Sequence, residues 1–472
     1  MNSQLAKKYS NIKWAEIDNT WLYKGESRLD GSYYCGDSVQ SYLILDKFPN
    51  KIEQISSFSK NVFYPGRFKR IWINVKNGKP FFTGAQILQA YPSTDKYIAP
   101  SKIPNIASYK VTPQQLLVTR SGTIGNITFT TEKLSNQLVT EHAIRIEIQN
   151  DIERGYVFAY LKSKIGNPLI QQSVFGAVID QVEPNHIEKI QIPIIDKIDF
   201  EKVGADIVQA FSLRDQANNL IDESRELFYK LLNLPNISID DVQCLKGKKV
   251  KVWDIDEFGF ENRFDSSFYY PLADLAIEKL KVSKYPISTL SNRELIKKVF
   301  IPGRFKRIYV KKEFGIPFLS GKNIVQMQPG DLKYLSLSKT KKLDGYIIKK
   351  NWILITCSGT IGRTALVTSE WNDWAATQHI LRVVPNNINP GYLYMFLSSD
   401  YGQFQIKRFI HGSVVDEISD KQIKQVVILN PDLNIQIQIG KKAQKAFEFR
   451  AKANNIEEKA IELLEAKIKE NI

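Results

Sequence analysis

The stretch Pro65-Gly66-Arg67-Phe68-Lys69-Arg70-Ile71 occurs twice in this chain. The same seven residues return as Pro302-Gly303-Arg304-Phe305-Lys306-Arg307-Ile308. A second motif, Ser121-Gly122-Thr123-Ile124-Gly125, recurs as Ser358-Gly359-Thr360-Ile361-Gly362, and the distance along the chain between the copies is the same for both motifs. Two separate motifs in one register exclude coincidence, so the chain contains an internal duplication.

Each copy has the pattern of a mixed domain built from short strands, with β-branched and aromatic residues between Gly and Pro. The first copy opens near Trp14, and late in each copy Gly176–Asp180 matches Gly412–Asp416. The expected strands are 71–75, 116–119, 144–148 and 190–195 in the first copy and 308–310, 352–356, 380–384 and 426–429 in the second. One helix is expected in each copy, at 156–163 and at 392–398.

A long helical stretch follows each domain, at 200–232 and at 435–470. Apolar residues there recur on alternating steps of three and four, which is typical of a coiled-coil seam. The seam residues are Phe200, Val203, Ile207, Ala210, Ala217, Ile221, Phe228 and Leu231 in the first stretch and Ile439, Ala443, Ala446, Ala453, Ile456, Ala460 and Leu464 in the second. A helix of this length is roughly 50 Å long, so we expect the two helices to bury each other. Arg214 and Arg450 interrupt the seams at equivalent positions, either fixing the register or extending from the seam edge.

The fold class expected from this order is α+β, with tandem duplicated mixed α/β domains that are each followed by a long α-helix. The expected boundaries are 1–196 for the first domain, 197–234 for the first long helix, 235–262 for a linker and the entry to the second repeat, 263–431 for the second domain and 432–472 for the second long helix. The Lys-rich stretch 244–251 is expected to form an exposed connection within that linker.

The composition favours a polyanionic partner. Among 472 residues, Lys and Arg outnumber Asp and Glu by 65 to 50, which gives a net charge of +15. Such an excess suits nucleic acid, although membrane surfaces and acidic proteins stay open as partners, and a basic surface can also be merely solvated.

The cysteines and the N-terminus indicate a reducing cytoplasm. Cys35, Cys244 and Cys357 are scattered and contain no Cys-x-x-Cys pair, so neither a disulfide framework nor a zinc site is readable. The first twelve residues are polar without a following apolar run, and no run of 18 apolar residues occurs. The chain is therefore expected to be neither secreted nor membrane-spanning.

The duplicated heptapeptide offers cations in a short loop, with a Phe between them. These cations are Arg67, Lys69 and Arg70 in the first copy and Arg304, Lys306 and Arg307 in the second. One interpretation is contact with DNA phosphates, because Arg binds phosphate well and Gly gives the backbone room to approach. The alternative is a solvated turn with the Phe as its core anchor.

The Ser-Gly-Thr-Ile-Gly turn follows a buried-looking strand. Its backbone N–H groups and the hydroxyls of Ser121, Thr123, Ser358 and Thr360 could bind an anion. It lacks the Gly-Lys-Ser/Thr of a P-loop, and a tight turn with two glycines at positive φ is the favoured alternative.

No catalytic constellation is readable. His142 and His379 are equivalent, but Glu141 precedes the first and Gln378 the second, so they are interpreted as satisfied core or edge residues. Asp180 and Asp416 match without a second carboxylate or His beside them. The chain has no P-loop, no methyltransferase motif and no metal-dependent nuclease cluster, which argues against an enzyme.

The order domain, helix, domain, helix, together with the strand-turn pattern 117–125 and its copy 353–362, resembles the specificity subunit of type I restriction-modification systems. The resemblance implies two target recognition domains, each reading half of a split double-stranded DNA site, and two helices paired as an antiparallel coiled-coil spacer. It also implies a non-catalytic subunit of a phage-defence complex that docks two methyltransferase subunits and a translocating endonuclease. No cofactor is expected on this chain, because S-adenosylmethionine would bind the methyltransferase.

Sequence divergence between the copies guides the choice of base-reading residues. The stretches 85–116 and 322–353 have equal length but little shared sequence, as do 126–140 and 363–377. Reading two unlike half-sites requires such divergence, although drift of exposed loops produces it too. The candidates are Lys96, Lys102 and Lys110 in the first copy and Lys339, Lys341, Lys342 and Arg363 in the second.

Two other functions stay open at this point. The chain could serve a related type II or phage-defence modification complex whose methylase and nuclease are fused. It could also be a protein scaffold without a role on DNA.

Overall fold

The computed structural model describes residues 19, 34, 36–172, 181–237, 263, 265–412 and 414–472. The chain divides into two compact units. Unit 1 comprises residues 1–215 and 453–472, and unit 2 comprises residues 216–452. Each long helix therefore contributes one part to each unit. The domain boundaries expected from chain order stay a prediction.

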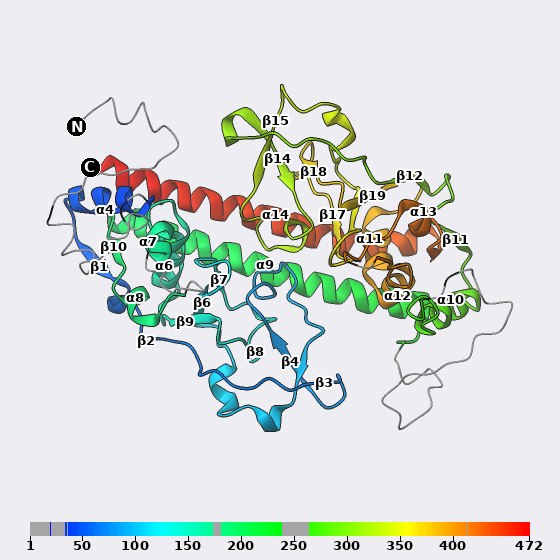
Figure 1. Cartoon of the computed structure of the whole chain (residues 1–472), viewed down its shortest axis with the longest axis horizontal. Coiled ribbons are helices and arrows are strands. Elements are labelled where there is room, and N and C mark those ends of the chain that lie inside the picture. Colours follow the sequence, from blue (N-terminus) through cyan, green and yellow to red (C-terminus); the bar gives the residue numbers. More distant parts are fainter. Residues whose placement is uncertain are drawn as a thin grey trace. The chain divides into compact units, whose positions relative to one another are not determined.

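Unit 1 contains the first copy of the repeat (Figure 1). Its elements are α4 (Ser38–Lys47), β1 (Ile52–Gln54), α5 (Ile55–Phe58), β2 (Asn61–Phe63), β3 (Trp72–Ile73), β4 (Lys79–Phe82), β5 (Tyr97–Ile98), η1 (Pro100–Lys102), η2 (Ile106–Tyr109), β6 (Gln115–Thr119), β7 (Ile127–Phe129), β8 (Leu138–Val139), β9 (Ala143–Glu147), α6 (Asp151–Lys162), α7 (Asn167–Gln172), α8 (Pro184–Glu188), β10 (Gln191–Pro193) and the first part of α9 (Lys197–Leu232). The end of α14 (Leu433–Glu470) completes it.

Unit 2 contains the second copy. Its elements are α10 (Leu272–Lys281), β11 (Ile287–Thr289), β12 (Ile296–Phe300), β13 (Tyr309–Val310), η4 (Lys312–Phe314), β14 (Gly315–Leu319), η5 (Asn323–Val325), β15 (Lys333–Ser336), η6 (Leu343–Gly345), β16 (Ile353–Thr356), β17 (Thr364–Leu366), β18 (Ala375–Ala376), β19 (Ile380–Pro385), α11 (Pro390–Ser398), α12 (Asp400–Arg408), α13 (Asp420–Ile423) and β20 (Val427–Leu429). The remaining parts of α9 and α14 belong to it.

The sheets of the two units have the same topology. The order β2-β9-β6-β7 in unit 1 corresponds to β12-β19-β16-β17 in unit 2, and β3-β5-β4-β8 corresponds to β13-β15-β14-β18. Both sheets of the second kind contain one parallel pair, β4 with β8 and β14 with β18. A two-stranded sheet, β1-β10 or β11-β20, completes each set. The α+β fold predicted from the duplicated sequence is confirmed.

Glycine pairs let a helix of each copy cross a long helix at close range. A Cβ on Gly155 of α6 would overlap the carbonyl oxygen of Gly204 in α9. In unit 2, a Cβ on Gly391 of α11 would overlap the carbonyl oxygen of Gly440 in α14. None of these glycines has positive φ, so close packing and not backbone conformation requires them. The second pair stands at the positions that correspond to the first in the register of the repeat.

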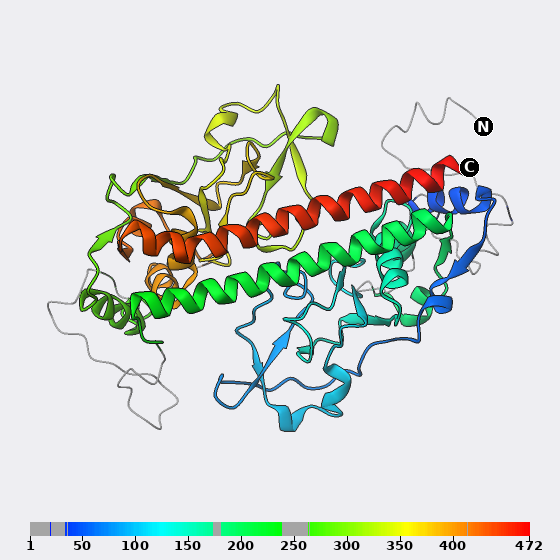
Figure 2. The same ribbon diagram turned by 180° about the vertical axis from the view of Figure 1, so that it is seen from behind.

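The long helices pair antiparallel within each unit, as expected. In unit 1 the first part of α9 and the end of α14 lie side by side (Figure 2), and Asp199 pairs with Lys467 at 3.3 Å. In unit 2, Ser224 Oγ donates to the carbonyl oxygen of Ile439 at 2.7 Å. The predicted apolar seam residues are buried except for Phe200, Leu231 and Ile456, which are half-buried.

Glu457, and not the predicted Ile456, occupies the seam of α14. The Glu457 carboxylate is fully buried, and two cations of unit 1 pair with it and balance its charge. Arg214 Nη1 donates to Glu457 Oε2 at 2.6 Å, and Lys162 of α6 pairs with Oε1. Arg214 also donates to Asn454 Oδ1 at 2.9 Å. Arg214 is thus an internal polar contact of the helix pair and does not reach solvent.

Most predicted elements occur with shifted ends. Helix α6 begins before the expected 156–163 because Asn150 Oδ1 accepts hydrogen bonds from the N–H groups of Ile152 and Glu153. The strand predicted at 71–75 shrinks to β3, since Asn74 begins a turn in which its carbonyl accepts from Gly78 N at 3.0 Å. Several predicted features lie outside the described residues: Trp14, Cys35, Cys244, the match 176–180 including Asp180, and the connection 244–251.

Candidate nucleic-acid interface

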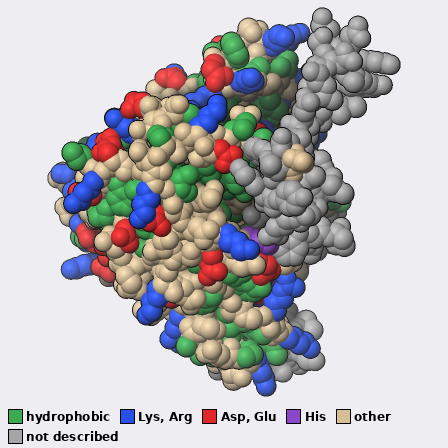
Figure 3. Space-filling view, turned by 90° about the vertical axis from the view of Figure 1, so that its left-hand side faces the viewer, with side chains coloured by type: hydrophobic (Ala, Val, Ile, Leu, Met, Phe, Trp, Pro, Cys, Tyr) green, Lys and Arg blue, Asp and Glu red, His purple; other side chains and the backbone are tan. Residues whose placement is uncertain are grey.

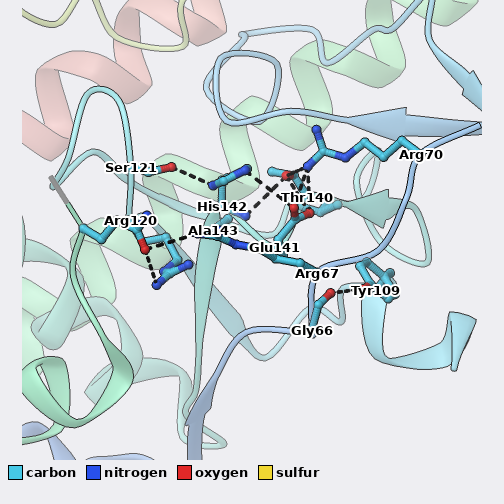
Figure 4. A network of polar contacts seen from close by, with 12 residues as sticks. Gly66, Arg67, Arg70, Tyr109, Arg120, Ser121, Thr140, Glu141, His142 and Ala143 are labelled. Atoms are coloured by element: carbon cyan, nitrogen blue, oxygen red, sulfur yellow. Dashed lines mark hydrogen bonds and ion pairs between the residues drawn. The ribbon is translucent and has the colours of Figure 1, made fainter. Parts of the chain in front are cut away.

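The heptapeptide loop is fixed to its domain by the Gly and the Phe. Phe68 packs edge-on against Tyr109 with ring centroids 5.0 Å apart, and the Tyr109 hydroxyl donates to the carbonyl oxygen of Gly66 (Figure 4). In unit 2, Tyr346 Oη donates to the carbonyl oxygen of Gly303 at 2.6 Å, with Phe305 beside its ring. The interpretation of the Phe as a core anchor is confirmed.

The cations of the loop differ in exposure. Arg67 and Lys69 are exposed in unit 1, as are Arg304, Lys306 and Arg307 in unit 2, whereas Arg70 is half-buried. Arg67 Nη2 donates to Gln181 Oε1 at 3.2 Å. The loop therefore presents most of its positive charge to solvent, as phosphate contact requires.

The Ser-Gly-Thr-Ile-Gly segment is a tight turn in both units, as expected. Gly122 and Gly125 have φ of 77° and 83°, and Gly359 and Gly362 have φ of 75° and 88°. A threonine at the end of the preceding strand closes each turn, because Thr119 Oγ1 donates to the carbonyl oxygen of Thr123 at 2.6 Å and the equivalent bond is present in unit 2. Thr123 and Thr360 stay exposed at the tip, whereas Ser121 and Ser358 are half-buried.

The segment Thr140-Glu141-His142 brings the loop and the turn together in unit 1 (Figure 4). Arg70 Nη2 donates to Thr140 Oγ1 at 3.2 Å and to the two carboxylate oxygens of Glu141 at 2.7 and 2.8 Å. His142 Nδ1 lies 2.7 Å from Ser121 Oγ. The two motifs found by sequence thus meet through residues on the loop that leads into β9.

The histidines lie at the centre of these clusters. Burial lowers the pKa of His142, and the guanidinium groups of Arg70, Arg67 and Arg120 lower it further against the opposing charge of Glu141. Burial likewise lowers the pKa of His379, with Arg307 and Arg304 acting in the same direction and Glu417 against them. Both rings are therefore neutral at pH 7 and act as hydrogen-bonding groups. The interpretation of both histidines as satisfied core or edge residues is consistent with the contact of His142 with Ser121 and that of His379 with Gln378.

Buried arginines that sequence reasoning did not select hold the histidine segments in place. Arg145 donates to the carbonyl oxygens of Thr140, Ala143, Val139 and Tyr109, over 2.6 to 3.4 Å. Its equivalent in unit 2, Arg382, donates to the carbonyl oxygens of Thr377, Ile380, Tyr346 and Ala376. Burial lowers the pKa of each guanidinium to about 10, so both stay charged at pH 7. The signal was available, because the two arginines stand at equivalent positions in the register of the repeat.

Arg120 supports the turn of unit 1 in a different way. Its guanidinium is buried, pairs with Glu183 and lies 3.9 Å from the ring centroid of Tyr64. Its Nε also donates to the carbonyl oxygen of Val182 at 3.1 Å. The equivalent residue in unit 2 is the buried Cys357, so this support is specific to unit 1.

A hollow of about 710 Å³ lies beside the two motifs in unit 2. It is lined by Arg307, Tyr309, Phe318, Ser320, Gly321, Lys322, Asn323, Asp331, Lys333, Thr356, Ser358, Gly359, Thr360, Arg363, Thr377, His379 and Val415. Four of the predicted site residues, Arg307, Ser358, Thr360 and Arg363, therefore meet at one place. Sequence reasoning missed Lys322 and Lys333, which line the same hollow.

The remaining predicted lysines are exposed, and none of them lines the hollow of unit 2. Lys96 precedes β5 and lies 5.8 Å from the ring centroid of Trp72, Lys102 lies in η1, and Lys110 follows η2. Lys339, Lys341 and Lys342 lie between β15 and η6. On the face shown in Figure 3, basic and acidic side chains are interspersed and form no single-sign patch among the described residues.

No described helix is both long and apolar enough to cross a membrane. Among the described residues, no group of three or more His, Cys, Asp and Glu side chains could hold a metal ion.

A family model, the type I restriction modification DNA specificity domain, matches residues 304–466. Residues 304–466 are therefore similar to a type I restriction-modification specificity domain. The matched residues begin in the second heptapeptide and end in α14, so they contain the hollow and its lining. The resemblance stated from the sequence is confirmed. The family is one of DNA specificity and not of catalysis, in agreement with the expectation that the chain is not an enzyme.

Solved structures similar to this chain include specificity subunits. The S subunit of a type I restriction-modification system from M. genitalium is 13% identical, with 89% of this chain and 96% of that chain covered and a TM-score of 0.32. The HsdS subunit from Thermoanaerobacter tengcongensis is 13% identical, with 90% and 97% covered and a TM-score of 0.28. A search of curated proteins found no significant match. Assignment of the specificity domain rests on the family match.

Proposed function

We propose that the chain is the DNA-binding specificity subunit of a type I restriction-modification complex and reads a bipartite sequence, one half with each unit. The observation that carries the proposal is the repetition of one topology with the same two loop motifs, of which the second copy lies in the matched specificity domain. Unit 1, which lies mostly outside the match, is assigned as the other reader because its sheets and loops correspond to those of unit 2.

The proposal includes two kinds of contact with the DNA. Exposed cations of the heptapeptide loops, with the hydroxyl groups of Ser121, Thr123, Ser358 and Thr360, contact DNA phosphates and fix the register of each domain. The lysines Lys96, Lys102, Lys110, Lys339, Lys341 and Lys342, with Arg363, lie on stretches that differ between the copies and contact base edges. Hydrogen bonds from Arg145 and Arg382 hold the segments between the two motifs of each unit in place.

The proposal includes the partners of the complex. Two methyltransferase subunits, which bring S-adenosylmethionine, and a translocating endonuclease dock on the chain in the cytoplasm, where the complex acts in phage defence. The antiparallel helices set the gap between the two half-sites.

Co-expression with its methyltransferase in a host without other modification enzymes tests the proposal. Methylome sequencing should show one bipartite motif with a fixed gap, and the methyltransferase expressed alone should leave that motif unmodified. A co-purifying complex that modifies no bipartite motif would overturn the proposed function.

A further inference from the structure

Arg70 and Arg307 are the same residue of the duplicated loop, but they have different partners. Arg70 contacts both carboxylate oxygens of Glu141, whose side chain is only 5% exposed. If Arg70 bound a phosphate instead, the Glu141 carboxylate would stay buried without its cation, which costs free energy. Burial raises the pKa of Glu141, but the Arg70 guanidinium outweighs it and holds the pKa below 4.5. At pH 7 the positive charge of Arg70 is therefore balanced by the Glu141 carboxylate within the domain.

Arg307 has a neutral partner in place of the carboxylate. Its Nη2 donates to Gln378 Oε1 at 2.9 Å and to Thr377 Oγ1 at 3.4 Å, and no described carboxylate pairs with it. The aromatic support is alike in the two units, since the guanidinium carbon lies 5.6 Å from the Phe318 ring centroid and that of Arg70 lies 5.3 Å from Phe81. The two sites thus share their geometry and differ in charge.

The surroundings of Arg307 add positive charge. Arg307, Lys322, Lys333 and Arg363 line the hollow of unit 2, against Asp331 as the one carboxylate among its described lining residues, which pairs with Lys322 at 3.1 Å. In the register of the repeat, Ala85 and Asn126 stand in unit 1 where unit 2 has Lys322 and Arg363, while Lys96 corresponds to Lys333. Glu417 is exposed, and its charge acts to raise the pKa of His379. It forms an isolated β-bridge with Ser358, and in unit 1 Gln181 forms the same bridge with Ser121. No described contact joins Glu417 to Arg307.

We propose that Arg307 is a phosphate contact on the DNA, whereas Arg70 is a scaffold residue held by Glu141. The pair Glu141 and Gln378 thereby makes the two units hold the DNA backbone unequally, with unit 2 the stronger. The inference rests on the proposed DNA-binding function and refines it, because both arginines were candidates of equal standing from the sequence.

Exchange of the two partner residues tests the inference. Glu141→Gln and Gln378→Glu each place at one site the residue that the other site already contains, so the local geometry tolerates both. The affinity of the purified full chain for a fluorescein-labelled duplex of mixed sequence is measured by anisotropy from about 50 to about 200 mM KCl. The readout is the slope of log affinity against log salt, which changes by about 0.9 for each phosphate contact.

Gln378→Glu and Arg307→Gln should each lower the steepness of the slope by about 0.9, and Glu141→Gln should raise it by about 0.9 by freeing Arg70. Over this fourfold range of salt, each change corresponds to about a threefold difference in the loss of affinity. Arg70→Gln should leave the slope unchanged.

Equal effects of Arg70→Gln and Arg307→Gln, or exchanges at 141 and 378 that leave a steep wild-type slope unaltered, would overturn the inference and keep the proposed function. A wild-type chain whose affinity does not fall with salt would overturn both. Thermal unfolding of each variant, measured in parallel, identifies any change that comes from lost folding.

Discussion

Buried charged residues stabilise local backbone structure in both units through hydrogen bonds. Arg145 and Arg382 each bind carbonyl oxygens on the segments around the histidines. Local sequence patterns could not predict these contacts, since a carbonyl acceptor has no side-chain signature. The identity of the two arginines at equivalent positions could have indicated them, because duplicated copies keep what the scaffold needs.

Asp215 is a half-buried charge with a testable consequence. Burial raises the pKa of its carboxyl from 3.8 to about 6, although Oδ1 accepts a hydrogen bond from Glu132 N at 3.0 Å. A raised folded-state pKa means that the folded protein binds the proton more tightly than the unfolded chain does. The protonated Asp215 therefore stabilises the folded state fully below pH 3.8, and this contribution is lost as pH rises through about 6.

Asp215→Asn keeps an acceptor for Glu132 N and removes the charge. The free energy of unfolding at pH 7 should therefore rise by about 1 kcal/mol, discounted for partial exposure. Urea unfolding between pH 4 and pH 7 measures it, with the exposed Glu201→Gln of the same helix as the control. A variant less stable than wild type at pH 7 would contradict this prediction.

At the scale of single elements, periodicity predicted the long helices well and the strands less well. The predicted 200–232 and 435–470 correspond to α9 and α14. The error at Ile456 has a physical reason: continued steps of three and four lead to Glu457, whose burial depends on Lys162 and Arg214 from other parts of the chain. The glycine crossings were missed for the same reason, because each joins helices far apart in sequence.

Glu457→Gln tests the polar seam of unit 1. The substitution leaves the buried Arg214 and the half-buried Lys162 without their carboxylate. The free energy of unfolding should therefore fall by about 3 kcal/mol. Chemical denaturation of the full chain gives the value.

The control is Glu458→Gln, which removes the same charge at the adjacent exposed position of α14. It should change the free energy of unfolding by less than about 0.5 kcal/mol. Equal effects of the two substitutions would show that the buried network does not stabilise the helix pair.

At the scale of the whole molecule, the duplication predicts independent readers. Replacing residues 85–116, which diverge from 322–353, by the matching stretch of a type I specificity subunit should change one half of the methylated motif and leave the other half and the gap intact. Methylome sequencing of the co-expressed complex reads both halves at once.

The reciprocal exchange of 322–353 is the matched control and should change the other half only. An exchange that alters both halves would contradict the assignment of one reader to each unit. The sequence predicts this division because identical motifs frame divergent stretches, but it does not identify the residues that read bases, which no repeated motif marks.

The shared helices also order events during synthesis. Unit 1 needs residues 453–472, which leave the ribosome only after all of unit 2 has been made. Until then Lys162 and Arg214 have no Glu457 to pair with, and the apolar face of Val203, Ile207 and Ala210 has no second helix. The first domain to be translated is therefore the last to be completed, and a nascent chain released before α14 lacks the finished form of either unit.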